Sequence, residues 1–330
     1  MPRFIRLIAP VALLLVFLLA ACGGSSATST LSATTAPTKA PTAAASSAAS
    51  TTATTGAPSA TVVATTAPTA ARTAAPAGTV AASSATTGTV AAASGTLTVF
   101  AAASLTESFT EIKGIFEKAN PGVMVQYNFG GSPTLVTQLT QGAPADVFAS
   151  ADQPNMDNAV KGGVIAGMPR TFVKNKLVLI VPKENKAGIM TPKDLAKPGV
   201  TFDTAQESVP VGKYTQQALD NFSKLPDYGA DFKANVNKNT VSREDNVKAI
   251  VQKVQLGEVD AGIVYTTDAQ AAKDKLTIIP IPDAQNVIAT YPVAVVKGAK
   301  QAALGQKFVD YLLSADGQAI LQKYGFAPGI

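Results

Sequence analysis

The chain has 330 residues, of which 46% are hydrophobic, 15% are charged and none is histidine. The lack of histidine excludes Ser-His-Asp catalysis and histidine metal sites, and a single cysteine excludes an intrachain disulfide and a thiolate zinc site. The net charge of +5 does not describe residues 96–330, because most of the excess positive charge lies before them. The only charged residues before residue 96 are Arg3, Arg6, Lys39 and Arg72. The remainder holds 22 acidic and 23 of the 27 basic residues, and its net charge of +1 without a clustered basic face predicts no nucleic-acid binding.

The N-terminus has the features of a secretory signal. Two arginines precede an apolar run over residues 7–21, which is too short for a comfortable membrane span and ends in small residues. Cys22 follows directly and resembles the lipidated cysteine of a bacterial lipobox. We therefore expect a signal peptide over residues 1–21, lipidation of Cys22, and an extracytoplasmic protein anchored to the cell membrane by its lipid. An ordinary signal peptide with an incidental cysteine is the alternative.

Residues 22–95 are almost entirely Ala, Thr, Ser, Pro and Gly, and no aromatic residue occurs among them. Such a segment cannot bury enough apolar surface to offset the entropy of ordering. The composition predicts a disordered linker between the lipidated cysteine and a folded part, and hydroxyl-rich tracts of this kind can also be glycosylated. A folded adhesive module is the alternative.

Residues 96–330 alternate short apolar runs with segments of helical periodicity. Strands are expected over residues 96–101, 123–129, 146–150, 177–181, 200–202, 260–265, 276–279 and 291–296. Helices are expected over 105–119, from 132, and over 211–222, 247–256 and 302–321. This alternation predicts an α/β protein with parallel sheets covered by helices on both faces.

Three predicted helix starts carry small or apolar residues where an active site would place charge. Ser104 and Ser132 are expected to cap two of these helices, and Val211 lies at the third. Gly130 and Gly131, just before Ser132, let the backbone approach a ligand closely. Helix N-termini present unpaired N–H groups and about half a positive charge, so several aimed at one point would bind an anion without arginine or lysine. Plain capping explains each start when it is taken alone.

Several segments resemble the molybdate-binding proteins of ABC transporters, in the same order and with similar spacing. The resemblance runs from residue 96 to the C-terminus and leaves out the linker. It is carried by Thr98-Val-Phe-Ala-Ala-Ala-Ser-Leu-Thr106, by Gly142-Ala-Pro-Ala-Asp-Val-Phe-Ala-Ser-Ala-Asp152, and by residues 209–212 (VPVG), 244–247 (EDNV), 262–269 (GIVYTTDA), 291–296 (YPVAVV) and 323–326 (KYGF).

The resemblance implies a two-lobed, periplasmic-binding-protein-like fold of type II. Each lobe would be a mixed, mostly parallel sheet flanked by helices, and two crossover strands would join them. Lobe 1 is expected over 96–176 and 291–330 and lobe 2 over 177–290, with hinges near Leu177 and Thr290.

The resemblance also implies the ligand contacts. Ser104 and Ser132 would each donate a hydroxyl and a backbone N–H, Val211 and Val247 would donate backbone N–H groups, and Tyr265 would donate its phenol. Val211 stands where alanine is common in the family, which a backbone contact tolerates. Val247 and Tyr265 are implied by the resemblance alone. In this scheme no protein atom ligates molybdenum directly.

Acidic residues offer a different kind of site. Asp146 and Asp152 flank the third strand, and Glu244 and Asp245 precede a helix. Acidic side chains near a helix N-terminus are stabilised by the helix dipole, which accounts for most residues of this kind. A site for a hard cation would need several carboxylate oxygens that converge on one point. Some archaeal relatives of the family coordinate the metal of the oxyanion with carboxylates in addition, and Glu244 and Asp245 are the candidates for such a role here. The local pattern nevertheless resembles the bacterial tetrahedral type, in which no carboxylate binds the metal.

The expected function is that of a monomeric solute-binding lipoprotein, not an enzyme and without a cofactor. It would capture molybdate or tungstate and deliver it to an ABC transporter permease. Three alternatives stay open: a binding protein for another tetrahedral dianion such as sulfate, an extracellular hydrolase that uses Ser104 or Ser132 with a lysine, and an adhesin on a stalk.

Overall fold

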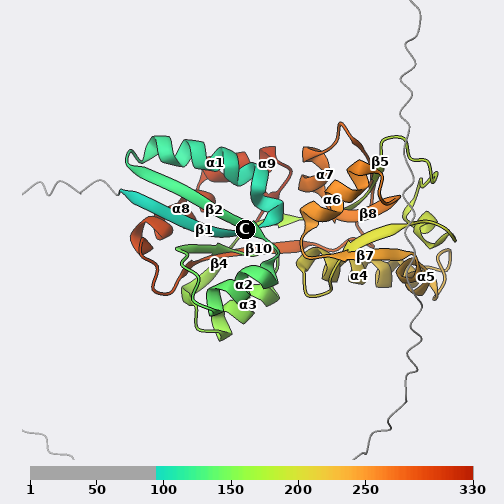
Figure 1. Cartoon of the computed structure of the whole chain (residues 1–330), viewed down its shortest axis with the longest axis horizontal. Helices are drawn as coiled ribbons and strands as arrows, with labels where there is room; N and C mark the ends of the chain where they lie inside the picture. The colour runs from blue at the N-terminus through green and yellow to red at the C-terminus, as the bar shows by residue number, and fades with distance from the viewer. Residues whose placement is uncertain (1–93, 330) are drawn as a thin grey trace, which may run out of the picture. The chain divides into compact units, whose positions relative to one another are not determined.

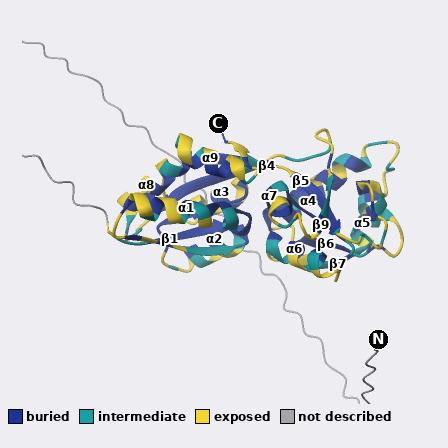
Figure 2. Cartoon of the chain, turned by 90° about the horizontal axis from the view of Figure 1, so that it is seen from above, coloured by how far each residue is buried: buried dark blue, intermediate teal, exposed yellow. Residues whose placement is uncertain are grey.

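The computed structural model describes residues 94–329, so the predicted signal peptide, Cys22 and nearly all of the predicted linker lie outside the described residues. The described residues form two β-sheets, each flanked by helices (Figure 1). Buried residues are concentrated along the strands of both sheets and on the helix faces that cover them (Figure 2). Between residues 94 and 329, no helix combines the length and apolar character that crossing a membrane requires.

Lobe 1 is built on a sheet of six strands in the order β11-β4-β10-β3-β1-β2. Its strands are β1 (Gly95–Ala102), β2 (Val123–Gly130), β3 (Val147–Ala149), β4 (Ile165–Asn175), β10 (Ala289–Val296) and β11 (Ala327–Pro328). Its helices are the short 3-10 helix η1 (Ala103–Leu105), α1 (Thr106–Ala119), α2 (Ser132–Thr140), α3 (Gln153–Lys161), α8 (Ala302–Leu313) and α9 (Ala315–Lys323). Helices α2 and α3 lie on one side of the sheet and α1, α8 and α9 on the other (Figure 1).

Strand β1 is apolar on both faces, so helices must cover both sides of the sheet at this point. Leu97 and Val99 point into the same buried cluster as Phe109 of α1, whereas Phe100 joins a second cluster with Leu135 of α2. A strand that is apolar on both faces reads as a continuous hydrophobic run, which is how this segment was recognised as a buried strand.

Lobe 2 is built on a sheet of five strands in the order β7-β6-β8-β5-β9. Its strands are β5 (Leu177–Pro182), β6 (Phe202–Ala205), β7 (Thr240–Glu244), β8 (Ala261–Tyr265) and β9 (Leu276–Pro280). Its helices are η2 (Pro192–Ala196), α4 (Pro210–Ser223), α5 (Phe232–Lys238), α6 (Val247–Leu256) and α7 (Thr266–Ala271).

Both sheets are mixed, as expected. Strand β1 runs parallel to β2 and β3, and β6 runs parallel to β7 and β8. Strand β10 is antiparallel to β3 and β4, and β5 is antiparallel to β8 and β9. Counting β11 with β4, antiparallel pairs slightly outnumber parallel ones. The strands through which the chain enters a lobe from the other one, β5 and β10, run antiparallel to the strands on both of their sides, so the antiparallel share is larger than the sequence suggested.

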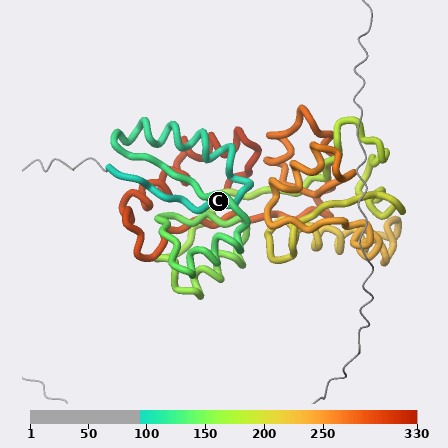
Figure 3. Tube along the Cα trace, in the orientation of Figure 1, coloured from blue at the N-terminus to red at the C-terminus, as the bar shows by residue number. Residues whose placement is uncertain are grey.

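The chain passes twice between the lobes (Figure 3). It leaves lobe 1 between the end of β4 at Asn175 and the start of β5 at Leu177, and it returns between Pro280 and Ala289. Among the described residues, strands of the second sheet come only from 177–280. Lobe 2 is thus an insertion into lobe 1, and the cavity described below lies where the two meet.

One expected helix was wrong, and several elements, among them strand β4, were not expected. The predicted helix over 302–321 is two helices, α8 and α9, because Ser314 is extended and accepts a hydrogen bond from the N–H of Gly317 at 3.2 Å. Strand β4 was not expected, since Gly167 and Pro169 interrupt its apolar pattern. Its pairing with β10 is correspondingly irregular.

Asp203 is fully buried on β6, and neither of its carboxylate oxygens has a hydrogen-bond partner among the described residues. Burial, together with the nearby carboxylate of Glu244, raises the pKa of Asp203 to about 7 against the opposing charge of Lys253. The folded protein therefore holds a proton that the unfolded chain, with a pKa near 3.9, releases.

We expect the free energy of unfolding to fall as the pH rises from about 4 to about 7, because the folded state binds the Asp203 proton more tightly than the unfolded state does. The total change from this group is of the order of 4 kcal/mol at most, at about 1.4 kcal/mol for each pKa unit. Urea unfolding of Asp203→Asn should lose this slope, whereas the exposed Asp274→Asn should keep it. Identical pH profiles for the two variants would contradict the assignment.

Candidate functional site

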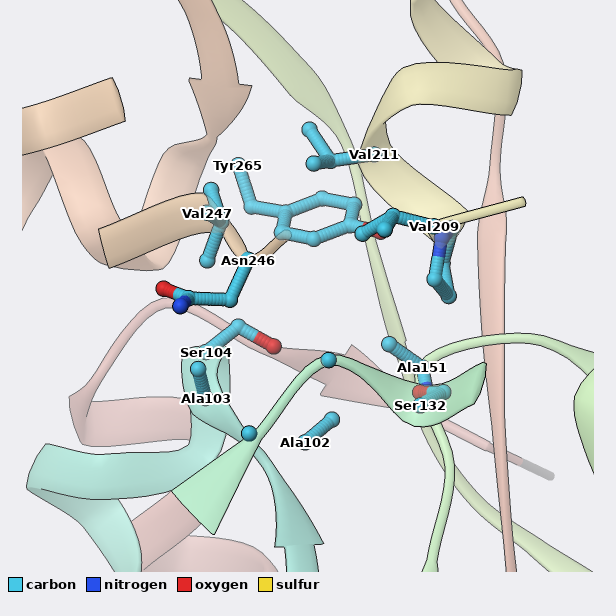
Figure 4. A pocket seen from close by; sticks show the side chains of 13 residues that line it. Ala102, Ala103, Ser104, Ser132, Ala151, Val209, Val211, Asn246, Val247 and Tyr265 are labelled. Carbon is cyan, nitrogen blue, oxygen red and sulfur yellow. The ribbon is translucent and has the colours of Figure 1, made fainter. Parts of the chain in front are cut away.

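A small cavity lies where the two lobes meet, and all five residues predicted to contact the ligand line it (Figure 4). Ser104 and Ser132 approach from lobe 1, and Val211, Val247 and Tyr265 approach from lobe 2. The volume that the centre of a water-sized sphere can occupy in the cavity is about 10 Å³. This is about the space that one water molecule needs, so the cavity suits a compact ligand of few atoms.

No charged residue lines the cavity. The other lining residues are Ala102, Ala103, Gly130, Gly131, Ala151, Val209, Pro210 and Asn246. The walls are therefore mostly apolar side chains, and the donors that can face a ligand are hydroxyls and backbone N–H groups. The amide of Asn246 is already bonded to Lys248, Ala249 and Asp245. Sequence reasoning did not single out Asn246, although it lies in the motif over 244–247.

The Ser132 hydroxyl accepts a hydrogen bond from the backbone, which leaves its own proton available to a ligand. It is the first residue of α2 and follows the N-cap Gly131, so the expectation that Ser132 itself caps the helix was wrong. Its Oγ instead accepts a hydrogen bond from the N–H of Ala151 at 3.1 Å. Because an N–H can only donate, the hydroxyl proton of Ser132 is left for another acceptor.

Ser104 lies inside η1, ahead of α1, so the expectation that it caps this helix was also wrong. The side chain is buried, and its Oγ is 2.9 Å from the hydroxyl oxygen of Tyr291. The hydroxyl of Ser104 points toward the space between the lobes in Figure 4. Both serines are thus buried beside the cavity with one polar neighbour behind them.

The two valines present backbone N–H groups at helix starts. At α6, the side chain of the N-cap Asn246 accepts hydrogen bonds from the N–H groups of Lys248 and Ala249. This cap does not include the N–H group of Val247. At α4, the N-cap residue makes no side-chain bond and Pro210 has no N–H, so Val211 carries the first N–H of the helix.

Tyr265 ends β8 and is almost completely buried. Its hydroxyl has no hydrogen-bond partner within residues 94–329. Burial raises the pKa of Tyr265 well above its ordinary value, with further contributions from the neighbouring tyrosines Tyr291 and Tyr214. The group is therefore protonated and able to donate, and a buried unpaired hydroxyl at a cavity indicates a missing acceptor.

The lobes touch through their main chains at the edge of the cavity. A side chain at Gly131 of lobe 1 would overlap the carbonyl oxygen of Asp245 of lobe 2. Glycine is needed here because only a residue without a Cβ allows the two backbones to come so close.

An ion-pair cluster also joins the lobes. The ammonium group of Lys248, on α6, lies 2.7 Å from both carboxylate oxygens of Glu107 on α1 and 2.9 Å from Asp268 of α7. The Asp268 side chain is fully buried, and burial raises its pKa despite the charge of Lys248. Burial alone would lower the pKa of Lys248, but the charges of Asp268 and Glu107 outweigh this effect and hold it above its ordinary value.

The other acidic residues have structural partners. Asp146 accepts hydrogen bonds from the backbone N–H groups of Thr98 and Gln301, and Asp152 caps α3. Glu244 is paired with Lys253 and Ser242, which lower its pKa although burial opposes them, and Asp245 is exposed. Neither Glu244 nor Asp245 lines the cavity. Among residues 94–329, no three His, Cys, Asp or Glu side chains are grouped so that they could hold a metal ion.

Two lobes around an uncharged, donor-lined cavity define a solute-binding protein. Residues 97–327 match the family described as bacterial extracellular solute-binding protein. The chain belongs to this family, and it adopts the two-lobed type II fold of periplasmic binding proteins.

The most similar proteins include solute-binding proteins that are named for molybdate or molybdenum. The chain is 40% identical over 223 residues to the molybdate-binding protein ModA of Mycobacterium tuberculosis, covering 68% of this chain and 81% of the relative. It is 33% identical over 228 residues to the putative ABC transporter substrate-binding lipoprotein YvgL of Bacillus subtilis, covering 67% and 82%. Among solved structures, the substrate-binding domain of a putative molybdenum ABC transporter from Clostridium difficile is 31% identical with a TM-score of 0.53, covering 71% of this chain and 98% of that one.

Proposed function

We propose that this protein captures molybdate outside the cytoplasm and delivers it to an ABC transporter permease. The observation that carries the proposal is the composition of the cavity, which offers neutral donors and no acceptor carboxylate to a compact ligand. The relatives named for molybdate support the choice of anion. Ser104, Ser132 and Tyr265 donate hydroxyls in this proposal, and Val211 and Val247 donate backbone N–H groups.

Neutral donors suit a fully deprotonated tetrahedral dianion. Each hydrogen bond to a charged group contributes about 1.5–3 kcal/mol, so several together can exceed the roughly 12 kcal/mol of a nanomolar complex before the costs of desolvation and closure. Phosphate near pH 7 always keeps at least one proton, because it is present as hydrogen phosphate or dihydrogen phosphate, and that proton would face another donor. Tungstate has the same charge and shape as molybdate and fits the same donors.

We expect calorimetric titration at pH 7.5 to show tight binding of molybdate and tungstate and much weaker binding of phosphate. Sulfate should also bind more weakly, because its shorter bonds leave some donors out of reach. The melting temperature should rise with molybdate concentration, as it does for any ligand that binds only the folded state. Sulfate binding as tightly as molybdate would contradict the choice of anion, and no binding of any of the four would contradict the function.

The proposal includes no catalytic activity. A Ser-Lys hydrolase would need a lysine beside Ser104 or Ser132, and no lysine lines the cavity that these serines share. In the proposed scheme the protein acts as a monomer, and molybdenum is bound only as its oxyanion.

Membrane attachment through Cys22 is a further part of the proposal, supported by the lipobox-like sequence and by the lipoprotein relative. We expect Cys22→Ser to move the protein from the membrane fraction to the soluble extracytoplasmic fraction, because the thioether-linked lipid can no longer form. A variant that combines Cys22→Ser with Ser25→Cys moves the cysteine by three positions and should not restore attachment. Lipidation requires a cysteine directly after the small residues at 20 and 21, and a thiol at another position does not replace it. Full retention of the first variant on membranes would rule out this anchor.

A further inference from the structure

Tyr291 lies directly behind Ser104 and has no contact with the cavity itself. It is on β10, where it pairs with Val173 of β4, and its side chain is fully buried. Its ring packs edge-on against Tyr265 and Phe326, with centroids 5.8 and 5.5 Å away. Tyr291 and Ser104 both belong to lobe 1, so their contact does not depend on the closure of the lobes.

The direction of the hydrogen bond between Tyr291 and Ser104 decides whether Ser104 can serve a ligand. A serine hydroxyl carries one proton. If Ser104 donated to Tyr291, it would have no proton left for an anion. If Tyr291 donates, the proton of Ser104 is free for the cavity.

The surroundings of Tyr291 determine this direction. Among residues 94–329, Ser104 is the hydrogen-bond partner of the Tyr291 hydroxyl. Tyr291 is fully buried, so a hydroxyl proton that it did not donate to Ser104 would be left without an acceptor in the protein interior, which is costly. Ser104, by contrast, lines the cavity and can direct its own proton toward a ligand there.

The favoured direction is therefore donation from the Tyr291 hydroxyl to the oxygen of Ser104. Burial raises the pKa of Tyr291 well above its ordinary value, so the proton is present at any ordinary pH. Ser132 shows the same arrangement without ambiguity, because its oxygen accepts from the N–H of Ala151. Each serine then has a fixed donor behind it and its own proton in front.

We propose that Tyr291 is a positioning residue for anion binding, which donates a hydrogen bond to Ser104 and thereby directs the hydroxyl proton of Ser104 into the cavity. This inference rests on the proposed function for the identity of the ligand.

A double-mutant cycle with molybdate tests the proposal. We expect Tyr291→Phe to weaken binding about 5- to 20-fold and Ser104→Ala to weaken it roughly 10- to 100-fold. The double variant should bind within about twofold of Ser104→Ala, because Tyr291 acts through Ser104 and has nothing left to position. Phenylalanine keeps the ring packing, so a merely structural role would not produce this dependence.

Tyr127→Phe is the matched control. Its hydroxyl donates to the carbonyl of Phe109 at 2.8 Å in the same sheet and does not line the cavity. Binding by this variant should stay within about twofold of wild type. Multiplicative effects of the Tyr291 and Ser104 changes, or unchanged binding by Tyr291→Phe, would overturn the proposal.

The hydrogen bond can be tested without a ligand. The buried Tyr291 hydroxyl proton should give a slowly exchanging downfield NMR resonance in the ligand-free protein, absent from Tyr291→Phe. It should move upfield in Ser104→Ala and stay in place in Ser132→Ala. A resonance that ignores the Ser104 change would overturn the proposed bond, whereas failure of wild type to bind molybdate would count against the proposed function.

Discussion

Replacing Tyr265 with phenylalanine is expected to weaken molybdate binding roughly ten- to a hundredfold while leaving the ligand-free protein as stable as before or slightly more stable. The hydroxyl is buried and has no hydrogen-bond partner within the described residues. In the ligand-free protein its desolvation therefore lowers stability, and no hydrogen bond to these residues offsets this cost. With an oxyanion bound it gains a hydrogen bond to charge, worth about 1.5–3 kcal/mol. Opposite effects on affinity and stability distinguish a ligand contact from a packing residue.

Titration calorimetry with molybdate and thermal melts of the ligand-free protein measure the two effects on the same sample. Tyr311→Phe is a suitable control, because the Tyr311 hydroxyl is also buried and unpaired in the part of the chain that the structure describes but lies on α8, away from the cavity. It should share the small change in stability and leave affinity untouched. Equal affinities of the Tyr265 variant and wild type would remove Tyr265 from the proposed site.

Lys248→Met is expected to lower the free energy of unfolding by about 3–5 kcal/mol near pH 8. The reason is that Asp268, whose side chain is fully buried, would lose its cationic partner, and an uncompensated buried charge is strongly destabilising. The loss should shrink as the pH falls, because burial already raises the pKa of Asp268 and protonation removes the charge. Urea unfolding at pH 8 and pH 5 measures both the loss and its pH dependence.

Two variants separate the parts of this cluster. Lys323→Met breaks an exposed ion pair with Glu111 on α1 within lobe 1 and should cost less than about 1 kcal/mol. Glu107→Gln keeps the pair between Lys248 and Asp268 but removes the charge that links the lobes, so it should weaken molybdate binding several-fold with little change in stability. Equal losses for Lys248→Met and Lys323→Met would contradict a special role for the buried pair.

The sequence was most informative where the signal is local. Helix starts with small residues follow from a few neighbouring positions, so Ser104, Ser132 and Val211 were found from the residue pattern, and the cavity brings all three together. Val247 and Tyr265 were implied only by the resemblance, because a strand tyrosine or the residue after an N-cap has many ordinary explanations. Their role as ligand contacts stays a prediction, as do the exact limits of the lobes.

What could not be predicted depends on long-range packing. Tyr291 meets Ser104 across 187 positions of the chain, and Lys248 meets Glu107 across 141. No spacing rule relates residues so far apart, because their proximity is created by the sheet order and by the closure of the lobes. The same holds for Asp203, whose raised pKa comes from burial that its neighbours in sequence do not indicate.

The contact of Gly131 with the Asp245 carbonyl sets a mechanical limit to closure. Main chain meets main chain there, so no change of side-chain rotamer would let these two segments approach further. At this edge of the cavity, the approach of the lobes is consequently limited by two backbone segments and not by side chains. Under the proposed function, the lobes would not move closer around a smaller anion at this point, and exchanging the lining side chains alone would leave this limit unchanged.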